Sequence, residues 1–568
     1  MLDMVIRRGL VVDGSGGPGW RADVGIMGGR IVAMGDVEDR SRREIDAEGC
    51  VVAPGFIDGH THLDAQIFWD PVSASLSSHG VTTAVMGNCG FTLAPAGEKD
   101  MDLVLRSIER AEDMKRSAIL AGVPWTWETF PEYLDAVDSL PKAFNCAAYV
   151  GHSALRAHVL GERAFEESAT EDEIAAMVVE VERSLRAGAL GFSTSRSFNH
   201  LTFSGQPVAS RWADWREVVA LVTVMGRLGV GVFQLAPERL DDPRERRDFE
   251  HRLVDLTRRT GRPATFMVSR DVDMLQGMAD EIALSGGQVV GQIHIRSLAN
   301  VYSFQTSLPF DRLPTWQEVR HLPLPEQQRL VASSELRGRL VDEAMCGRYG
   351  PVYGAEPKPP TFELMYPVGG EDAGRSVAEL AQRAGTTPVD IILDRALATG
   401  FRQCFIQHGS IDGSNDLDRE AEVRIGLLRR ADTVLAASDS GAHVSQILDS
   451  NIPGALLSSW VRERHLLGWE EAVRILTYEP ATLWGLNDRG LLRNGYRADL
   501  VVFHPDTVGS SVPQVVHDLP DGGPRLVQHG VGFQAIVVNG TVTWREGNCT
   551  GDFPGTLIRG PLAVNGCR

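Results

Sequence analysis

Short apolar segments alternate with amphipathic helical segments through the middle of this chain. The helical period is clearest over residues 171–187, where Ile174, Met177, Val181 and Leu185 fall on one face. Eight apolar segments have the length and composition of buried parallel strands, namely residues 53–58, 82–87, 145–150, 190–193, 229–234, 264–268, 289–293 and 433–437. Alternating strands and helices predict an α/β fold with a parallel sheet. Eight such repeats predict a (β/α)8 TIM-type barrel.

The two ends of the chain have a different pattern, with short strands separated by Asp-Gly, Gly-Gly and Asn-Gly turns. We therefore expect residues 1–53 and 488–568 to form one small β-sandwich domain built from both termini. Residues 54–487 then hold the barrel. Within them, residues 297–400 lose the alternation and contain many prolines, which predicts an insertion over the active face that could act as a lid.

The composition of the chain argues against several classes of protein, including nucleic-acid-binding and membrane-spanning proteins. The 568 residues carry 56 Lys and Arg against 75 Asp and Glu, and this net charge of −19 argues against a protein that binds a nucleic-acid backbone. No apolar run approaches the roughly 18–20 residues of a spanning helix, and the first residues do not resemble a signal peptide. Seven cysteines without a CxxC motif are typical of reduced thiols. We expect a cytoplasmic protein with a small-molecule substrate, no nucleic-acid or membrane partner, and a homo-oligomeric state left open.

The clearest chemical motif is His-x-His at the end of the first predicted barrel strand. His60 and His62 close the segment GFIDGHTHLD at residues 55–64. Residues two apart point to the same side of a strand, so both imidazoles face one way. At the mouth of a barrel such a pair is half of a metal site. The competing interpretation is two exposed histidines, and the position directly after a strand favours metal binding.

Two further candidates follow other strands. Cys89 lies in the sequence Met-Gly-Asn-Cys-Gly after the second strand, and a thiolate is a strong metal ligand. A buried structural cysteine is the alternative. Asp439 lies in SDSGAH at residues 438–443 after the last strand. A carboxylate there could bind metal and accept a proton from an activated water, or it could simply form an Asx turn.

Two histidines and two arginines are candidates for substrate binding. His152 ends the third strand, and His294 has the alternation that would bring it to the mouth from the seventh strand. Arg196 could hold a substrate carboxylate through two hydrogen bonds, as could Arg296. The competing interpretation is a hydrogen-bonded structural histidine in the first two cases and a surface arginine in the others.

Jointly these motifs resemble the metal-dependent amidohydrolase superfamily and, within it, the D-aminoacylase (N-acyl-D-amino-acid deacylase) branch. The resemblance spans most of the chain and rests on residues 55–64, 87–90, 151–156, 191–195, 438–443, 497–503 and 538–540. It implies a barrel with a small β domain, zinc, and hydrolysis of an amide bond. His60, His62, Cys89 and Asp439 match the family's metal and catalytic positions.

Two positions depart from the family pattern. The family has a metal-binding histidine at the end of strand five and another at the end of strand six. Here the strand-five candidates are Gln234 and Ala236, and strand six runs through residues 265–270 without a histidine. Loss of both imidazoles should abolish the tighter metal site or leave it very weak, because the neutral carbonyl of glutamine suits harder cations.

The resemblance therefore implies a reduced site with one zinc ion rather than two. His60, His62 and Asp439 remain as ligands, and Cys89 is either a fourth ligand or a close neighbour. Three protein ligands and a water make a sufficient catalytic zinc site.

The expected activity is metal-dependent hydrolysis of a C–N amide bond, in an N-acyl amino acid or a related linear or cyclic amide. The metal would polarise the carbonyl and lower the pKa of its bound water, and Asp439 would carry the proton to the leaving nitrogen. One alternative keeps the fold but uses the depleted site for lyase or isomerase chemistry. Another is a catalytically silent binding protein, because a fold alone does not guarantee a function.

Overall fold

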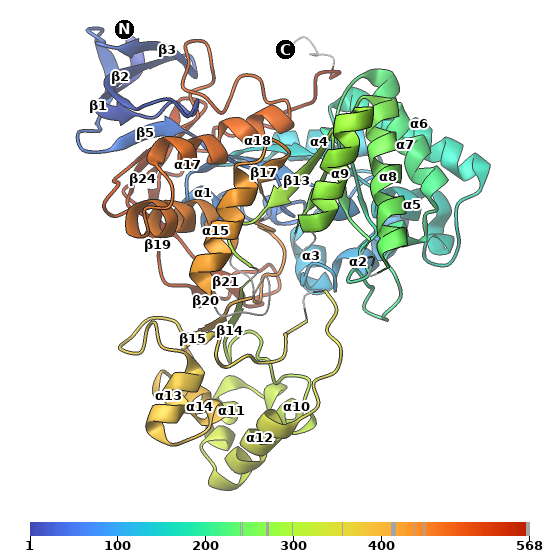
Figure 1. Ribbon diagram of the computed structural model, residues 1–568, viewed down its shortest axis with the longest axis vertical. Helices are drawn as coiled ribbons and strands as arrows, with labels where there is room; N and C mark the ends of the chain where they lie inside the picture. Colours follow the sequence, from blue (N-terminus) through green and yellow to red (C-terminus); the bar gives the residue numbers. More distant parts are fainter. Residues whose placement is uncertain are drawn as a thin grey trace.

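The computed structural model describes residues 1–568 except 239, 241, 269–271, 298, 355, 410–415, 437, 447–448 and 564–568. Strands and helices alternate through the centre of the molecule. A β-sheet that contains the N-terminus lies at one end, and a lobe of short helices lies at the other (Figure 1). The chain is therefore of mixed α/β class, as predicted.

Parallel strands occupy the eight predicted positions. They are β6 (Phe56–Asp58), β7 (Val81–Met86), β8 (Asn145–Ala148) continued by β9 (Val150–Gly151), β10 (Gly191–Ser195), β11 (Val232–Ala236), β12 (Ala264–Met267), β13 (Val289–Ile293) and β17 (Thr433–Leu435). One parallel run joins β6, β7 and β8, and another joins β9 to β13 and then β17. The chain just after β6 meets the chain just after β17 in a parallel bridge between Thr61 and Ser440. These pairings favour the predicted barrel.

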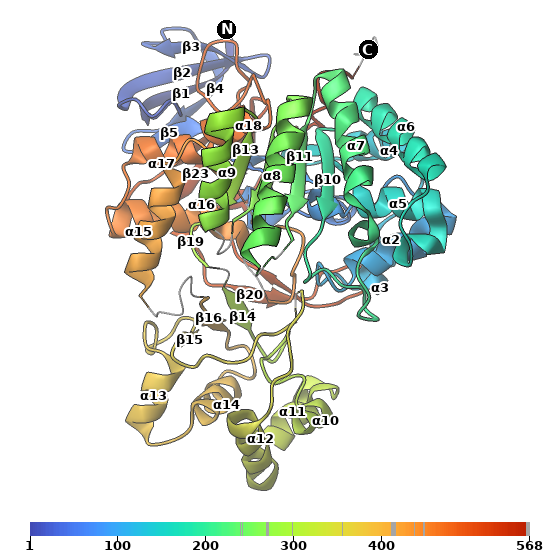
Figure 2. The ribbon, with the colours of Figure 1, turned by 45° about the vertical axis from the view of Figure 1, so that its right-hand side comes forward.

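Helices cover the outside of the strands, and the strands themselves are buried along almost their whole length. The covering helices include α5 (His152–Leu160), α6 (Glu171–Ala187), α7 (Trp215–Leu228), α8 (Pro243–Thr260), α9 (Val272–Ser285) and α15 (Leu417–Leu428). Figure 2 shows α7, α8 and α9 next to β10, β11 and β13. Helix α6 has the predicted bounds because both ends are capped. The Thr170 hydroxyl accepts from the Glu173 N–H, and Gly188 takes the left-handed conformation at the other end.

The two termini share one nine-stranded sheet. Its strands are β1 (Leu2–Val11), β2 (Trp20–Met27), β3 (Arg30–Gly35), β4 (Ser41–Asp46), β5 (Val51–Pro54), β18 (Leu500–Phe503), β23 (Phe533–Val538), β24 (Thr541–Arg545) and β25 (Asn548–Cys549). The junction is β5, which pairs with β1 in parallel and with β18 antiparallel. Residues 554–557 leave this sheet and bridge to Lys142 and Cys146 beside β8. Both ends of the chain thus contribute strands to one sheet, and the small β domain with its bounds and its sandwich architecture stays a prediction.

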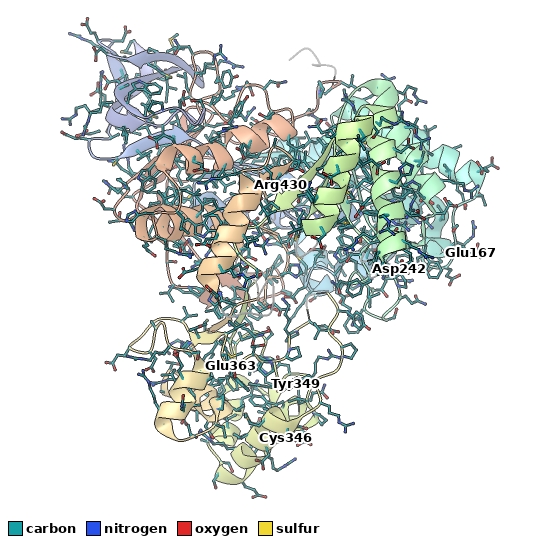
Figure 3. The ribbon with its side chains drawn as sticks, in the orientation of Figure 1. Glu167, Asp242, Cys346, Tyr349, Glu363 and Arg430 are labelled. Atoms are coloured by element: carbon teal, nitrogen blue, oxygen red, sulfur yellow. The ribbon has the colours of Figure 1, made fainter. Side chains whose placement is uncertain are left out.

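The lobe of short helices is formed within residues 297–400, and the interpretation of these residues as an insertion stays a prediction. It holds α10 (Pro314–Arg320), α11 (Leu324–Val331), α12 (Ser334–Cys346), α13 (Val377–Ala384) and α14 (Pro388–Ala398). The antiparallel strands β14 (Asn300–Tyr302), β16 (Phe405–Gln407) and β15 (Met365–Pro367) connect it to the strand-and-helix body. The lobe has its own hydrophobic cluster around Trp316, separate from the main core. Cys346, Tyr349 and Glu363 mark it in Figure 3.

The remaining elements connect these parts. They are α1 (Ala74–Ser77), α2 (Met101–Ile108), α3 (Arg116–Gly122), α4 (Phe130–Ser139), α16 (Ile452–Ala455), the π-helix Leu456–Glu463, α17 (Trp469–Leu476), α18 (Tyr478–Leu483), β19 (Gly509–Ser510), β20 (Gln514–Val516), β21 (Arg525–Val527) and β22 (Gly530–Val531). Among the described residues, no helix combines the length and the apolar character needed to cross a membrane.

Candidate metal centre

The two histidines of the His-x-His motif lie directly beyond β6 and are buried. Backbone hydrogen bonds fix their segment against the last strand, because the His62 N–H donates to the Ser440 carbonyl at 2.7 Å and the Asp439 N–H donates to the His60 carbonyl at 3.2 Å. Asp58 closes the turn by accepting from the His60 N–H at 3.2 Å. The two imidazole rings lie 5.4 Å apart between centroids, so both side chains face the same small volume.

Cys89 lies in a tight turn after β7. Its φ is 54°, and the flanking Gly87 and Gly90 also have positive φ. A side chain at Gly90 would meet the Thr194 backbone at 3.0 Å, so the turn needs a glycine there. The turn brings the Cys89 sulfur to 3.6 Å from the His60 Nε2 atom. The possible ligand atoms of His60, His62 and Cys89 all lie within 4.8 Å of one another, which is close enough for one metal ion.

Asp439 completes the group from the turn after β17. Its Oδ1 lies 3.2 Å from the His60 Nε2 and 3.7 Å from the His62 Nε2, and its Oδ2 lies 3.9 Å from the His443 Nε2. Burial raises the pKa of this carboxyl, but hydrogen bonding to His62 and the three neighbouring imidazoles outweigh burial and hold the pKa well below its usual range. The structure thus brings together all four residues predicted as metal ligands from three different strand ends.

Two glutamines, one on β11 and one on β13, form hydrogen bonds with the proposed metal ligands. Gln234 of β11 is fully buried, and its Oε1 accepts from the Cys89 N–H at 2.6 Å. Its Nε2 lies 4.0 Å from the Cys89 sulfur. Gln234 therefore anchors the cysteine turn through its amide oxygen. Ala236 offers no donor atom, and residues 269 and 270 after β12 lie outside the described part of the chain.

Gln292 of β13 acts on His60. Its Oε1 lies 2.6 Å from the His60 Nδ1. An amide oxygen can only accept, so the Nδ1 must carry the proton, and the Nε2 lone pair is left free toward Cys89 and Asp439. A hydrogen bond of this kind fixes the tautomer and orientation of a metal-binding imidazole. No motif in the sequence predicted a role for Gln292, although it is a single polar side chain within an otherwise apolar strand.

Glu112 is a second residue that the sequence analysis missed. It lies between α2 and α3 and is 3% exposed, and its Oε2 is 3.6 Å from the His62 Nε2. That oxygen has no hydrogen-bond partner among the described residues. The local sequence Arg-Ala-Glu-Asp is typical of an exposed helical face and gave no sign of a buried carboxylate.

The pKa shifts at the centre can be compared with what a bound cation would require of its ligands. Burial raises the pKa of Cys89 well above its usual value, and the carboxylates of Glu112 and Asp439 add to the shift. Burial also lowers the pKa of His62 to about 4, so this imidazole is neutral and able to bind metal. A divalent cation reverses the penalty on the thiolate and the carboxylates. With nitrogen, sulfur and oxygen donors gathered within a few ångströms, the residues present fit a zinc ion.

His152, predicted as a substrate ligand, lies in a closed polar network instead of an open mouth. Its Nδ1 pairs with the Thr194 hydroxyl at 2.8 Å and its Nε2 with the Glu217 carboxylate at 2.7 Å. The other Glu217 oxygen pairs with Arg156. His152 and Arg156 are both fully buried. Both ring nitrogens of His152 are engaged with protein groups, and this geometry favours the competing interpretation of a hydrogen-bonded structural histidine.

The other two substrate candidates are also engaged with protein groups. The guanidinium of Arg196 pairs with Glu238 and donates to the Ala213 carbonyl at 2.8 Å. The Nδ1 of His294 lies 2.8 Å from the Arg296 carbonyl, and its Nε2 lies 3.5 Å from the Asp449 carboxylate. Of the two, only His294 lies beside a cavity, because its partner Asp449 lines one.

That cavity has a volume of about 590 Å³, and none of the proposed metal ligands is among its lining residues. One part of its lining is polar, where Arg296 pairs with Asp449 at 2.8 Å. The rest is mainly apolar and comes from the three-stranded sheet of the lobe and from the chain after β19. It comprises Ala299, Val301, Tyr366, Pro367, Val368, Ile406, Val512 and Pro513 among others. Its volume is that of a small-molecule site.

Comparison with known proteins identifies one family for this chain. The family model described as "Amidohydrolase family" matches residues 43–299 and 373–550, which leaves most of the helical lobe outside the match. D-aminoacylase of Alcaligenes xylosoxydans xylosoxydans is 29% identical over 98% of this chain and 97% of its own length. N-acyl-D-aspartate deacylase of the same organism is 28% identical over 98% of this chain and 95% of its own length. An uncharacterized protein of Mycobacterium tuberculosis is 30% identical over 97% and 93%.

Solved structures show the same fold. A crystal structure of D-aminoacylase superposes with a TM-score of 0.63 at 24% identity, covering 98% of this chain and 100% of that one. N-acyl-D-glutamate deacylase of Bordetella bronchiseptica, complexed with zinc and a phosphonate inhibitor, also gives 0.63 at 24% identity, covering 98% and 99%. The likeness extends over nearly the whole length of each chain, the terminal sheet and the helical lobe included.

Proposed function

The chain belongs to the amidohydrolase family, and from this premise we propose that it hydrolyses the amide bond of an N-acyl amino acid with a bound metal ion. The observation that carries the proposal is the convergence of His60, His62, Cys89 and Asp439 on one buried volume. The relatives support the reaction class, because D-aminoacylase and the N-acyl-D-aspartate and N-acyl-D-glutamate deacylases all match along the length of this chain.

In this proposal His60, His62 and Asp439 hold the metal, and Cys89 is a further ligand or a close neighbour. A bound zinc ion supplies Lewis-acid polarisation of the carbonyl and a water of lowered pKa. With the ion bound, Asp439 would serve as the general base toward water and then as the acid toward the leaving nitrogen, and its lowered pKa keeps the carboxylate ionised. Gln292 keeps the His60 Nε2 aimed at the centre.

We propose one ion per chain rather than two. Gln234, on the strand where the family has a histidine, uses its amide oxygen on the Cys89 N–H, and Ala236 cannot bind metal. A solved D-aminoacylase with a binuclear centre is described with one-metal activation and second-metal attenuation, so a single ion is compatible with activity in a relative.

For the substrate we propose an N-acyl amino acid whose apolar part lies in the cavity under the lobe. The arginine and aspartate on the cavity wall already neutralise each other, and the surrounding side chains are mainly apolar. Such a lining favours an uncharged acyl or aliphatic group over a second carboxylate. The D configuration is proposed from the names of the relatives alone.

We further propose that the eight parallel strands form a closed (β/α)8 barrel, with residues 1–53 and 488–568 as a small β domain. The bridge between Thr61 and Ser440 and the junction at β5 support this architecture. The lobe of residues 297–400 is then an insertion late in the barrel, between β13 and β17.

The test combines elemental analysis with a substrate panel. Protein purified without chelators should hold about one zinc per chain, and His60→Ala/His62→Ala should hold none. Wild type should cleave some members of a panel of N-acetyl D- and L-amino acids. Asp439→Asn should lose turnover, while Asp432→Asn, a carboxylate at the opposite end of the same strand, should retain it. Retained hydrolysis in Asp439→Asn would refute the mechanism, and metal without hydrolysis across the panel would favour non-hydrolytic chemistry.

A further inference from the structure

A buried carboxylate with no counter-charge is the feature of this centre that the four recognised residues do not explain. The single ion-pair contact found for Glu112 among the described residues is with His62, and its Oε2 has no hydrogen-bond donor there. Carboxylates are almost never buried in this way unless they are paired or coordinate a metal. The unexplained oxygen therefore points to a cation as its partner.

The neighbouring buried carboxylate shows the contrast. Asp64 is buried to a similar degree, with 5% of its surface exposed against 3% for Glu112. Its Oδ2 accepts a hydrogen bond from the Gly87 N–H at 2.9 Å, and its Oδ1 lies 3.5 Å from the Tyr133 hydroxyl. Both of its oxygens therefore have protein partners. Glu112 is buried to a similar degree, but its Oε2 has no hydrogen-bond partner among the described residues. This difference distinguishes a ligand-binding carboxylate from a structural one.

The direction of the Glu112 side chain adds a second observation. Its Oε2 lies 3.6 Å from the His62 Nε2, and Asp439 places an oxygen 3.7 Å from the same nitrogen. Ligand atoms of His60 and Cys89 lie within 4.8 Å of one another and of a His62 ring nitrogen. Glu112 thus places an oxygen beside the His62 member of this group, from a segment of chain that none of the proposed ligands uses.

The segment that carries Glu112 is fastened to the segment that follows Asp439. The Glu112 carbonyl accepts from the His443 N–H at 2.6 Å. The next residue, Asp113, accepts from the Ser445 N–H at 3.0 Å and from its hydroxyl at 2.5 Å. Three hydrogen bonds therefore set the distance between the two carboxylates, as a metal site requires of its donors.

We propose that Glu112 is a further ligand of the metal ion, and that it supplies a donor in place of the histidines absent from strands five and six. The inference rests on the metal-dependent function proposed above. It changes the expected donor set from two imidazoles, a thiolate and one carboxylate to the same set with two carboxylates. An additional anionic oxygen strengthens binding of a divalent cation without needing a side chain from β11 or β12.

The test measures metal binding directly and does not depend on turnover. Wild type, Glu112→Gln and Glu109→Gln are stripped of metal and titrated with zinc in competition with a chromophoric chelator. Glu109 is a partly exposed carboxylate three residues earlier and serves as the matched control. We expect Glu112→Gln to bind zinc at least about ten-fold more weakly, with Glu109→Gln like wild type. The visible spectrum of the cobalt-loaded protein should also change in Glu112→Gln alone.

Thermal unfolding gives an independent signature. Without metal, Glu112→Gln should melt at a higher temperature than wild type, because a neutral amide costs less to bury than a carboxyl group whose Oε2 has no hydrogen-bond partner. With zinc, the order should reverse, because the variant gains less stabilisation from the ion. A structural carboxylate would instead lower the melting temperature in both states when replaced.

The outcomes separate this inference from the function on which it rests. Unchanged zinc affinity and an unchanged cobalt spectrum in Glu112→Gln would overturn the inference, and lost turnover with unchanged binding would also overturn it by indicating proton transfer. Either result leaves the proposed function standing if wild type binds zinc and cleaves an N-acyl amino acid. Wild type that binds no metal would overturn both.

Discussion

Replacing Glu217 by glutamine should destabilise the protein strongly and leave the chemistry of its site intact. The Glu217 carboxylate accepts from His152 through one oxygen and pairs with Arg156 through the other, and His152 and Arg156 are wholly inaccessible to solvent. The Arg156 Nη2 also donates to the Glu167 carbonyl at 2.6 Å, but its Nε has no partner among the described residues. Glu217 is therefore the one anion that the structure pairs with this buried guanidinium.

The expected loss of unfolding free energy arises because the substitution leaves a buried positive charge without its partner. An amide keeps one acceptor but loses the negative charge, so Arg156 stays buried without a counter-ion. Removing one partner of a buried ion pair costs about 3–5 kcal/mol. Whole-domain stabilities are roughly 5–15 kcal/mol, so this is a large fraction of the total. His152 can adapt by accepting from the new amide, and for that reason we place the cost on the arginine.

Denaturant unfolding followed by fluorescence measures this cost, with midpoint and slope compared between wild type and variant. The Glu217 pKa is lowered in the fold because pairing with His152 and Arg156 outweighs burial, so its stabilising contribution is present above the ordinary pKa of 4.5 and is lost as pH falls below it. The difference between the proteins should therefore shrink toward pH 3. The KM of the remaining folded enzyme should not change. A loss below about 1 kcal/mol, or a raised KM with unchanged stability, would refute this reasoning and restore His152 as a substrate contact.

Two further predictions address the support of the centre and its pH range. Gln292→Leu removes the acceptor of the His60 Nδ1 proton, so zinc affinity measured by chelator competition should fall about 10–100-fold. If the variant bound zinc as tightly as wild type, other contacts would have to orient the imidazole. His79 is buried against the Ser75 carbonyl and the Ser510 hydroxyl, and burial lowers its pKa from 6.5 to about 4. The wild type should therefore lose stability as pH falls from 6.5 to 4, by about 3 kcal/mol from this group. His79→Gln should lack that part of the loss in melting curves, and parallel curves for the two proteins would contradict the assignment.

The strands and the four ligand candidates could be predicted because both depend on local pattern. Apolar runs of strand length recur at eight places, and polar residues directly after them lie at one end of a parallel arrangement. Helix α6 has its predicted bounds because its capping residues are adjacent in sequence. His60, His62, Cys89 and Asp439 each follow a strand, and this alone brings them together.

Glu112 and Gln292 could not be predicted in the same way. The meaning of each depends on a partner far along the chain, since Glu112 acts on His62 and Gln292 on His60. Glu112 lies among charged residues whose pattern is that of a solvated helix, and burial by other segments cannot be read from that pattern. His152 was ambiguous for the opposite reason, because the end of a strand suits a substrate ligand and a structural histidine equally well.

The two glutamines explain how the centre can keep its shape with fewer imidazoles. Gln234 and Gln292 reach it from β11 and β13, yet each uses its amide oxygen on a protein N–H, one on the cysteine turn and one on His60. They therefore act on the proposed ligands and leave the coordination itself to others. A second ion would need donors from these same strands, and among the described residues there the amide oxygens are already engaged. Glu112 adds an oxygen that has no hydrogen-bond partner among the described residues and lies 3.6 Å from the His62 Nε2. This distribution favours one ion held between two carboxylates over two ions held across the strands.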